Sequence, residues 1–414
     1  MRKSIYFSIL VFCFYSFLLI VPGGYSLFAA LLGTLSVAVL LFLRPLAFSA
    51  SDRLFAFFLA LYPLLMIPSL LFKGGTWDFF DYPIRALLFI PLIIGLRSSA
   101  NAPEFQPALL LGCNVGGIFA ALFCLKRVLL DHVEGVGLPV AASIAYGQIA
   151  AIIGLISFAF LFNEAPPARR VIAWFGFFGS VFAVTASSST GALLGFVVGL
   201  AALVLFRFKD HPNRFHLLGL FVAAFLAIVV LLPLIFVDFP RIISEVQRYQ
   251  AGTQVFTSQG QRLLLWSMAV KELLLSPLFG IGPGHFDTVM DQYCATSQCT
   301  PDFHGFHGVH NQFLDSAMNA GLVGFFGLMA SYLGPLVLFF KRISNPLSSS
   351  HSSEAARAGV AVILAGMVSG LSQVLYGHNI SVISYFLTIT FLWYLANQPP
   401  FSAGKLVNTY PFSE

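Results

Sequence analysis

His310 is the residue of this sequence best suited to acid–base chemistry at a membrane surface. Asn311 follows it, and an apolar run begins within a residue or two, so the imidazole is expected at the boundary between lipid and water. A neutral imidazole accepts a proton near pH 7, and at that boundary it meets both lipid-linked and water-borne molecules. The alternative is an interfacial histidine that only hydrogen-bonds nearby backbone.

A metal site is another possible use of the same histidines. His304, His307 and His310 recur at every third position, with Gly305 and Gly308 between them. That spacing matches none of the common zinc patterns, and the glycines favour a loop. We therefore expect neither a metal nor another cofactor at these residues.

Arginines upstream of His310 suit the binding of an anion. Arg262 lies near the start of residues 261–275, whose composition is that of a helix lying on a membrane surface. A guanidinium binds phosphate oxygens through its planar fork, and a helix N-terminus adds free N–H groups and a favourable dipole. Contact with lipid headgroups is the ordinary alternative. Arg241 and Arg248 have the same two interpretations with less support, and Asn311 is a further candidate for substrate binding.

A second group of polar residues is expected near the same surface. Arg85 follows Asp81 at the spacing of a helical ion pair. Ionisable groups at this depth are costly and usually face a cavity, so structural pairing and substrate contact both remain open, with pairing favoured. His378, in the short loop YGHNIS, can approach the same surface and is a candidate for substrate binding.

The composition identifies the kind of molecule that must position these residues. The chain has 414 residues, 58% hydrophobic and 9% charged, whereas soluble domains carry about 25% charged residues. This predicts an all-α polytopic membrane protein in which residues 1–414 form a single integral membrane domain. Because a span needs about 20 apolar residues, we expect about twelve spans. They are expected at residues 4–21, 25–43, 54–72, 83–97, 106–125, 144–162, 171–186, 190–206, 217–237, 312–340, 357–375 and 381–396.

The distribution of Lys and Arg predicts the orientation. Cations gather in alternate short loops, which places both termini and the linker at residues 341–356 in the cytoplasm. Residues 238–311, the one long segment without a span, then face outward as a large loop between the ninth and tenth spans. Long aqueous loops carry function more often than packing. The same bias accounts for the net charge of +5, so no nucleic-acid partner is expected.

Motifs of several other classes are absent from the sequence. It contains no Asp-x-Asp, no Walker loop and no His-Glu-x-x-His, so a metal-held nucleotide-sugar site is not expected. A transporter with about twelve spans is the alternative from another class, but transporters tend to have internal repeats and polar groups at the bilayer midplane. This chain concentrates its polar groups at one outer face. Cys294 and Cys299 lie in the long loop, and whether they form a disulfide remains open.

Two stretches carry a more specific pattern. They are RLLLWSMAVKELLLSPLFGIGPGHF at residues 262–286 and HNQFLDSAMNAGLVGFFG at residues 310–327. Both resemble the O-antigen ligase and polymerase superfamily of bacterial inner-membrane glycosyltransferases, and SIAYGQIA at residues 143–150 resembles a segment of the ligase branch. The resemblance implies a GT-C-like bundle in the bacterial inner membrane, with residues 238–311 as a large periplasmic loop that contains short helices.

The same resemblance implies roles for individual residues. His310 is expected to help activate the acceptor hydroxyl, and Arg262 to hold the diphosphate of an undecaprenyl-diphosphate-linked glycan. The reaction is expected to invert the anomeric centre and to need no metal. In ligases the acceptor is a sugar hydroxyl of lipid A–core. In polymerases it is a second lipid-linked glycan, and in protein O-oligosaccharyltransferases it is a pilin side chain.

One element of the family pattern is different here. The family usually has an arginine in a Ser-Arg-Gly element at the outer start of a span, whereas this sequence reads Ser189-Thr190-Gly191. Thr190 therefore stands where that arginine is expected. One contact to the diphosphate is either missing or supplied by Arg241, Arg248 or Arg85.

Overall fold

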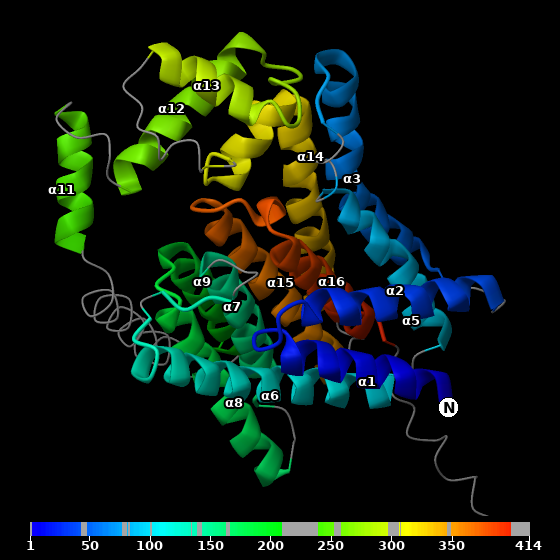
Figure 1. Ribbon diagram of the computed structural model, residues 1–414. Coiled ribbons are helices and arrows are strands. Elements are labelled where there is room, and N and C mark those ends of the chain that lie inside the picture. The colour runs from blue at the N-terminus through cyan, green and yellow to red at the C-terminus, as the bar shows by residue number, and fades with distance from the viewer. Residues whose placement is uncertain are drawn as a thin grey trace, which may run out of the picture.

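The computed structural model is built from helices (Figure 1). It describes residues 2–42, 48–76, 81, 83–99, 102–133, 135–138, 143–162, 166–208, 239–251, 258–296, 306, 308–345 and 349–398. Within these ranges there is no strand, which confirms the all-α prediction.

Apolar helices long enough to cross a membrane make up nearly half of the described chain. Seven described helices meet this criterion, so the chain is a polytopic membrane protein. They are α2 (Gly24–Phe42), α3 (Ala50–Lys73), α6 (Ala102–Leu129), α7 (Ser143–Phe160), α9 (Thr190–Phe208), α14 (Gln312–Ile343) and α16 (Asn379–Ala396). The span predicted at residues 217–237 lies outside the described residues.

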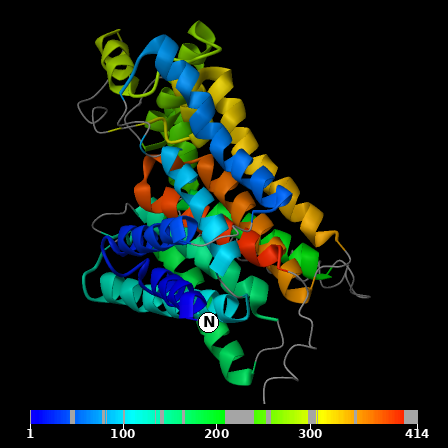
Figure 2. The same cartoon turned by 90° about the vertical axis from the view of Figure 1, so that its right-hand side faces the viewer.

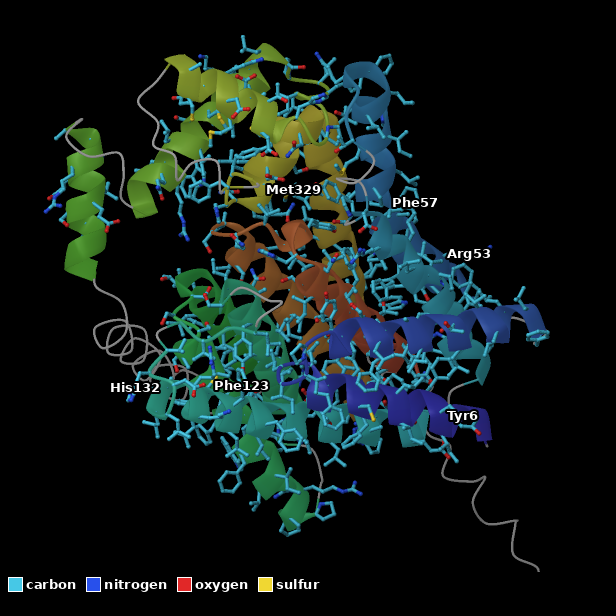
Figure 3. The ribbon with its side chains drawn as sticks, in the orientation of Figure 1. Tyr6, Arg53, Phe57, Phe123, His132 and Met329 are labelled. Atoms are coloured by element: carbon cyan, nitrogen blue, oxygen red, sulfur yellow. The ribbon has the colours of Figure 1, made fainter. Side chains whose placement is uncertain are left out.

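Further helices complete the bundle. They are α1 (Arg2–Phe17), α8 (Pro167–Ala186) and α15 (Ser350–Gly370). The closest pairings join α3 to α14, α9 to α15, α1 to α6, and α8 to both α6 and α7. Large apolar side chains such as Phe57 on α3 and Tyr6 on α1 point away from the bundle (Figure 3). An apolar outer surface of this kind suits lipid contact.

Two predicted spans have different boundaries in the structure. Residues 83–97 do not form one long helix: a short 3₁₀ turn, η1 (Arg85–Leu88), precedes α5 (Phe89–Ser99). With 11 residues, α5 is about 16 Å long, roughly half the thickness of the hydrocarbon core. The span predicted over 357–375 ends early, because α15 stops at Gly370 and the chain turns before η3 (Leu375–Gly377).

Three helices are described between α9 and α14. They are α11 (Phe239–Gln250), α12 (Ser258–Leu275) and α13 (Phe286–Thr296). The helix predicted over 261–275 is confirmed, and α13 is a helix that the sequence did not predict. Phe286 and Met290, one turn apart, are both buried, and this apolar stripe stabilises the helix despite its polar composition.

We call these three helices and the turn at residues 276–285 the loop layer. Its helices α12 and α13 lie by the ends of α3 and α14, whereas α11 stands to one side, at the left of Figure 1 (Figures 1 and 2). The layer has a small hydrophobic core of its own, separate from the core of the bundle. Its buried members are Leu265, Met268, Ala269, Phe286, Met290, Val309 and Met318. This core holds α12 and α13 against the start of α14.

The loop layer is inserted into a break in α14. At Gly321 the backbone leaves the helical region, with φ 64° and ψ −163°, and the carbonyls of Met318 and Asn319 turn to the loop layer. They accept hydrogen bonds from the N–H groups of Ile281 (2.8 Å) and Gly282 (3.1 Å). Beyond the break, Leu322 N–H donates to the Pro277 carbonyl (2.8 Å).

Glycine is required on both sides of this crossing. A Cβ on Gly321 would collide with the Leu278 carbonyl, and one on Gly280 would collide with the Met318 carbonyl. The turn also contacts the end of α3, where Thr76 N–H donates to the Pro283 carbonyl (3.0 Å). The glycine-rich stretch at residues 280–284 is therefore the part that fastens the loop layer to the bundle.

The length of α14 indicates where the break lies along the bundle. Its 32 residues extend about 48 Å, whereas the hydrocarbon core is about 30 Å thick. The residues after Gly321 suffice to span that core. The part before it, Gln312 to Ala320, belongs with the loop layer and begins beside His310.

Candidate functional site

His310 has a backbone conformation that its neighbours must hold in place. Its φ is 51°, a value that non-glycine residues seldom adopt. Just before it, Val309 N–H donates to Asp315 Oδ1 (3.3 Å) and the Val309 carbonyl accepts from Trp266 Nε1 (3.0 Å). Side chains from α12 and α14 thus fix both polar groups of Val309, and with them the direction of the His310 side chain.

Asn311, predicted to bind substrate, caps α14. Its Oδ1 accepts hydrogen bonds from Phe313 N–H (3.0 Å) and Leu314 N–H (3.2 Å). Capping of this kind satisfies N–H groups that the helix itself leaves without partners. The cap sets the start of α14 directly after His310.

The His310 imidazole belongs to a chain of hydrogen bonds that joins two histidines through a glutamine. His310 Nδ1 lies 2.6 Å from Gln373 Oε1, and Gln373 Nε2 lies 2.6 Å from His378 Nε2. The edge of the Phe306 ring packs against the imidazole, with ring centroids 5.1 Å apart. The structure therefore brings together His310 and His378, whose separation the sequence does not define.

Gln373 is the functional residue that sequence reasoning missed. The predicted span 357–375 placed it inside the membrane, whereas the helix ends at Gly370 and Gln373 lies in the turn that follows. The glutamine itself could have pointed to this position, because a polar group without a partner is costly inside a bilayer and Gln373 lies near the outer end of an apolar run.

Arg262 approaches the same cluster from the loop layer. It lies on α12, four residues before Trp266, and its positive charge lowers the pKa of His310. Burial lowers the pKa of Arg262 itself. Within the described residues, no hydrogen bond or ion pair involves the guanidinium, so its charge is not neutralised by the protein there.

Burial favours the neutral form of both histidines. It lowers the pKa of His310, and although the hydrogen bond to Gln373 raises that pKa, the charge of Arg262 lowers it further, as a proton on His378 would. Burial also lowers the pKa of His378. In the described part of the chain, His310 Nε2 has no hydrogen-bond partner. The cluster therefore offers an imidazole that favours its neutral form, near a guanidinium that has no ion-pair partner among the described residues.

The remaining predicted cations are placed differently. Arg85 forms the ion pair with Asp81 and also donates a hydrogen bond to Asn379, the residue after His378. Arg248 is an exposed residue of α11, which packs against α12. Arg241 lies in the first turn of α11, and its side chain is outside the described residues.

Thr190, which stands where the family arginine was expected, begins α9 near the histidine cluster. The next residue, Gly191, accepts a hydrogen bond from Ser369 Oγ (3.1 Å) at the end of α15, only a few residues before Gln373. The position is thus close to the cluster, but it carries a short hydroxyl side chain instead of a cation.

Two predictions about this loop concern residues that are only partly described. His304 and His307 lie outside the described residues, and the described part of the chain contains no group of His, Cys, Asp and Glu arranged to hold a metal. Cys294, at the end of α13, is disulfide-bonded, and Cys299 lies outside the described residues.

Comparison with known proteins extends this picture. A family model described as O-antigen ligase matches residues 175–329, a segment that runs from α8 to the second part of α14. A protein of Haemophilus influenzae, described as uncharacterized, is 24% identical over 391 residues, which cover 92% of this chain and 95% of the relative. The family match contains Arg262, the Gly-Pro-Gly turn and His310, whereas Gln373 and His378 lie beyond it. The match over residues 175–329 supports a relationship between this chain and the O-antigen ligase superfamily.

Proposed function

We propose that this protein is an O-antigen ligase. It transfers a glycan from undecaprenyl diphosphate to a sugar hydroxyl of lipid A–core, at the periplasmic face of the bacterial inner membrane. The observation that carries the proposal is the hydrogen bond from Trp266 of α12, the helix that bears Arg262, to Val309, the residue before His310, within the segment that the ligase family model matches. A neutral base and a cation are the two groups that such a transfer needs.

In the proposed reaction the acceptor hydroxyl attacks the anomeric carbon of the donor. The new C–O bond forms as the bond from that carbon to the diphosphate oxygen breaks, and its electron pair leaves with undecaprenyl diphosphate. His310 Nε2 takes the proton of the hydroxyl. A single displacement of this kind inverts the configuration of the anomeric carbon.

Arg262 stabilises the charge that grows on the leaving diphosphate. Its partial burial strengthens this effect, because an electrostatic interaction is worth more where water is partly excluded. The positive charge of a guanidinium, presented by a rigid helix, gives the donor site a way to offset the diphosphate without a metal. Arg248, Arg241 and Arg85 are proposed to guide the anionic donor toward this site.

A deletion strain distinguishes ligase from polymerase and from protein O-oligosaccharyltransferase. For a ligase, a lipopolysaccharide gel of the strain loses every capped form while lipid-linked polymer accumulates. Loss of a polymerase leaves core capped with a single repeat unit. Loss of a protein O-oligosaccharyltransferase leaves the lipopolysaccharide pattern unchanged, and either of these last two outcomes contradicts the ligase assignment.

A further inference from the structure

Gln373 is a buried amide that contacts both histidines of the candidate site. The turn that carries it is anchored to the start of α14, because Tyr376 N–H donates to Gln312 Oε1 (2.9 Å). Gln373 therefore reaches His310 from a segment fixed to the same helix that His310 precedes. The packing of α14, α15 and η3 therefore holds Gln373 in place.

The two ends of an amide impose opposite requirements on their partners. The oxygen of glutamine only accepts hydrogen bonds, and its nitrogen only donates them. Since Gln373 Oε1 lies 2.6 Å from His310 Nδ1, that nitrogen must carry a hydrogen. Since Gln373 Nε2 lies 2.6 Å from His378 Nε2, this second nitrogen must be bare. With the amide in this orientation, neutral His310 and neutral His378 therefore both carry their hydrogen on Nδ1 rather than on Nε2.

We propose that Gln373 is a positioning residue that selects the tautomer of His310 with the hydrogen on Nδ1 and a bare Nε2. The inference rests on the proposed function only for its catalytic consequence, because a bare Nε2 is what accepts the proton of the acceptor hydroxyl. The opposite orientation of the amide would place the hydrogen on Nε2 and remove the base.

The same hydrogen bond serves both protonation states of His310. When Nε2 takes a proton, Nδ1–H still donates to Gln373 Oε1, so nothing needs to rearrange. The amide adds no charge, unlike the carboxylate that orients the histidine in many triads. The titratable groups that face His310 among the described residues are Arg262 from α12 and His378 from the turn before α16. The charge of Arg262 disfavours the imidazolium, and His378 does so only when it is itself protonated. Asp315 of α14 turns to Val309 N–H instead.

The tautomer is measured directly by ¹⁵N NMR of histidine-labelled protein in lipid nanodiscs, with the His310 signals identified by their loss in His310→Asn. Imidazole ¹⁵N shifts distinguish a protonated nitrogen from a bare one. The expected result is a protonated Nδ1 and a bare Nε2 in the wild type at pH values where the ring is neutral. In Gln373→Met, which has similar volume but no amide, the expected result is a mixture that includes protonated Nε2. A wild-type His310 with its hydrogen on Nε2 overturns the proposal.

Gln373→Glu provides a second readout that a merely structural role would not change. A carboxylate beside Nδ1 favours the imidazolium, so the NMR titration of His310 is expected to move to higher pH by about one unit or more. The transfer rate rises with pH on the acidic side of its pH profile, and this rise is expected to move to higher pH as well. In Gln373→Met we expect the turnover number to fall about 10- to 100-fold with little change in the donor KM. Unchanged titration of His310 in Gln373→Glu contradicts the proposal.

Ser372→Ala is the matched control on the same turn. The Ser372 hydroxyl donates to the Ser369 carbonyl (3.2 Å), so its removal leaves the amide bridge intact. This variant is expected to keep the wild-type tautomer, titration and rate. If the NMR results are as expected but neither wild type nor variants transfer glycan to lipid A–core, the proposed function fails while the role of Gln373 stands.

Discussion

At the scale of single residues, the site combines a histidine that favours its neutral form with an arginine that has no ion-pair partner among the described residues. Burial and the charge of Arg262 lower the pKa of His310, which keeps the base unprotonated at a lower pH than an ordinary histidine. Arg262 is partly buried itself, so water screens its charge less than at an open surface. Each group thus stays in the form that the proposed transfer uses.

The pH dependence of transfer follows from this arrangement. Because the neutral form of His310 is the base, the rate is expected to rise as pH increases through its pKa and then to stay constant. Because the pKa of His310 is lowered, this rise of the rate, the acidic limb of the pH profile, is expected below the usual pKa of histidine. Arg262→Gln removes one of the causes of the lowering, so the limb is expected to move to higher pH, with slower transfer and weaker donor binding.

Lys271→Gln is the control for Arg262→Gln. Lys271 is an exposed cation on the same helix and lies over the Tyr293 ring, away from the histidines. Its replacement is expected to leave the acidic limb in place. Rates measured from about pH 4 to pH 9 with purified protein test both variants, and an unmoved limb in Arg262→Gln would show that its charge does not act on His310.

At the scale of elements, the break in α14 is the feature that joins the loop layer to the bundle. The backbone of residues 277–282 replaces the missing helical hydrogen bonds of α14 at Gly321. This single junction places α12, and with it Arg262 and Trp266, over the residue that precedes α14. The glycines of the family pattern are explained by this crossing of two backbones.

Gly321→Ala tests the junction. The added Cβ collides with the Leu278 carbonyl, and a left-handed φ is costly for alanine, so together these effects are expected to destabilise the junction by about 2–4 kcal/mol. Thermal unfolding in detergent should begin at lower temperature, and transfer should be lost. Gly33→Ala, where a Cβ meets nothing within 4 Å, is the control. Equal thermal stability of the two variants would contradict the role of the break.

Elements with a local sequence pattern could be predicted from the sequence, whereas contacts between distant residues could not. Apolar runs predicted most of the long helices, and the composition of residues 261–275 predicted α12. The insertion of the turn into α14 could not be predicted, because it depends on hydrogen bonds between residues about 40 positions apart. Gln373 was not predicted as a site residue, because the apolar pattern continues to residue 375 and does not show that α15 ends at Gly370. His310 and Arg262 were predicted one by one, and only the fold brings them together.

At the scale of the whole molecule, α12 and α13, which pack against the start of α14, lie at one end of the helix bundle (Figures 1 and 2). We expect that end to face the periplasm, because the cations of the short loops favour the cytoplasm for the other end. The account therefore predicts one orientation for the entire chain.

Cysteine labelling in intact cells tests this orientation. Ser267 is exposed on α12 and Ser350 is exposed at the start of α15, at opposite ends of the bundle. A membrane-impermeant maleimide is expected to label Ser267→Cys without lysis and Ser350→Cys only after lysis, in each case against the parent protein as background. The reverse pattern would place the histidine cluster in the cytoplasm, where a periplasmic transfer cannot occur.

The most direct test of the central claim is transfer by purified protein in nanodiscs. The donor is undecaprenyl-diphosphate-linked glycan and the acceptor is lipid A–core. We predict transfer by the wild type, and in His310→Ala a rate lower by about 100-fold or more with donor binding retained. A His310→Ala protein that transfers glycan at the wild-type rate would contradict the account.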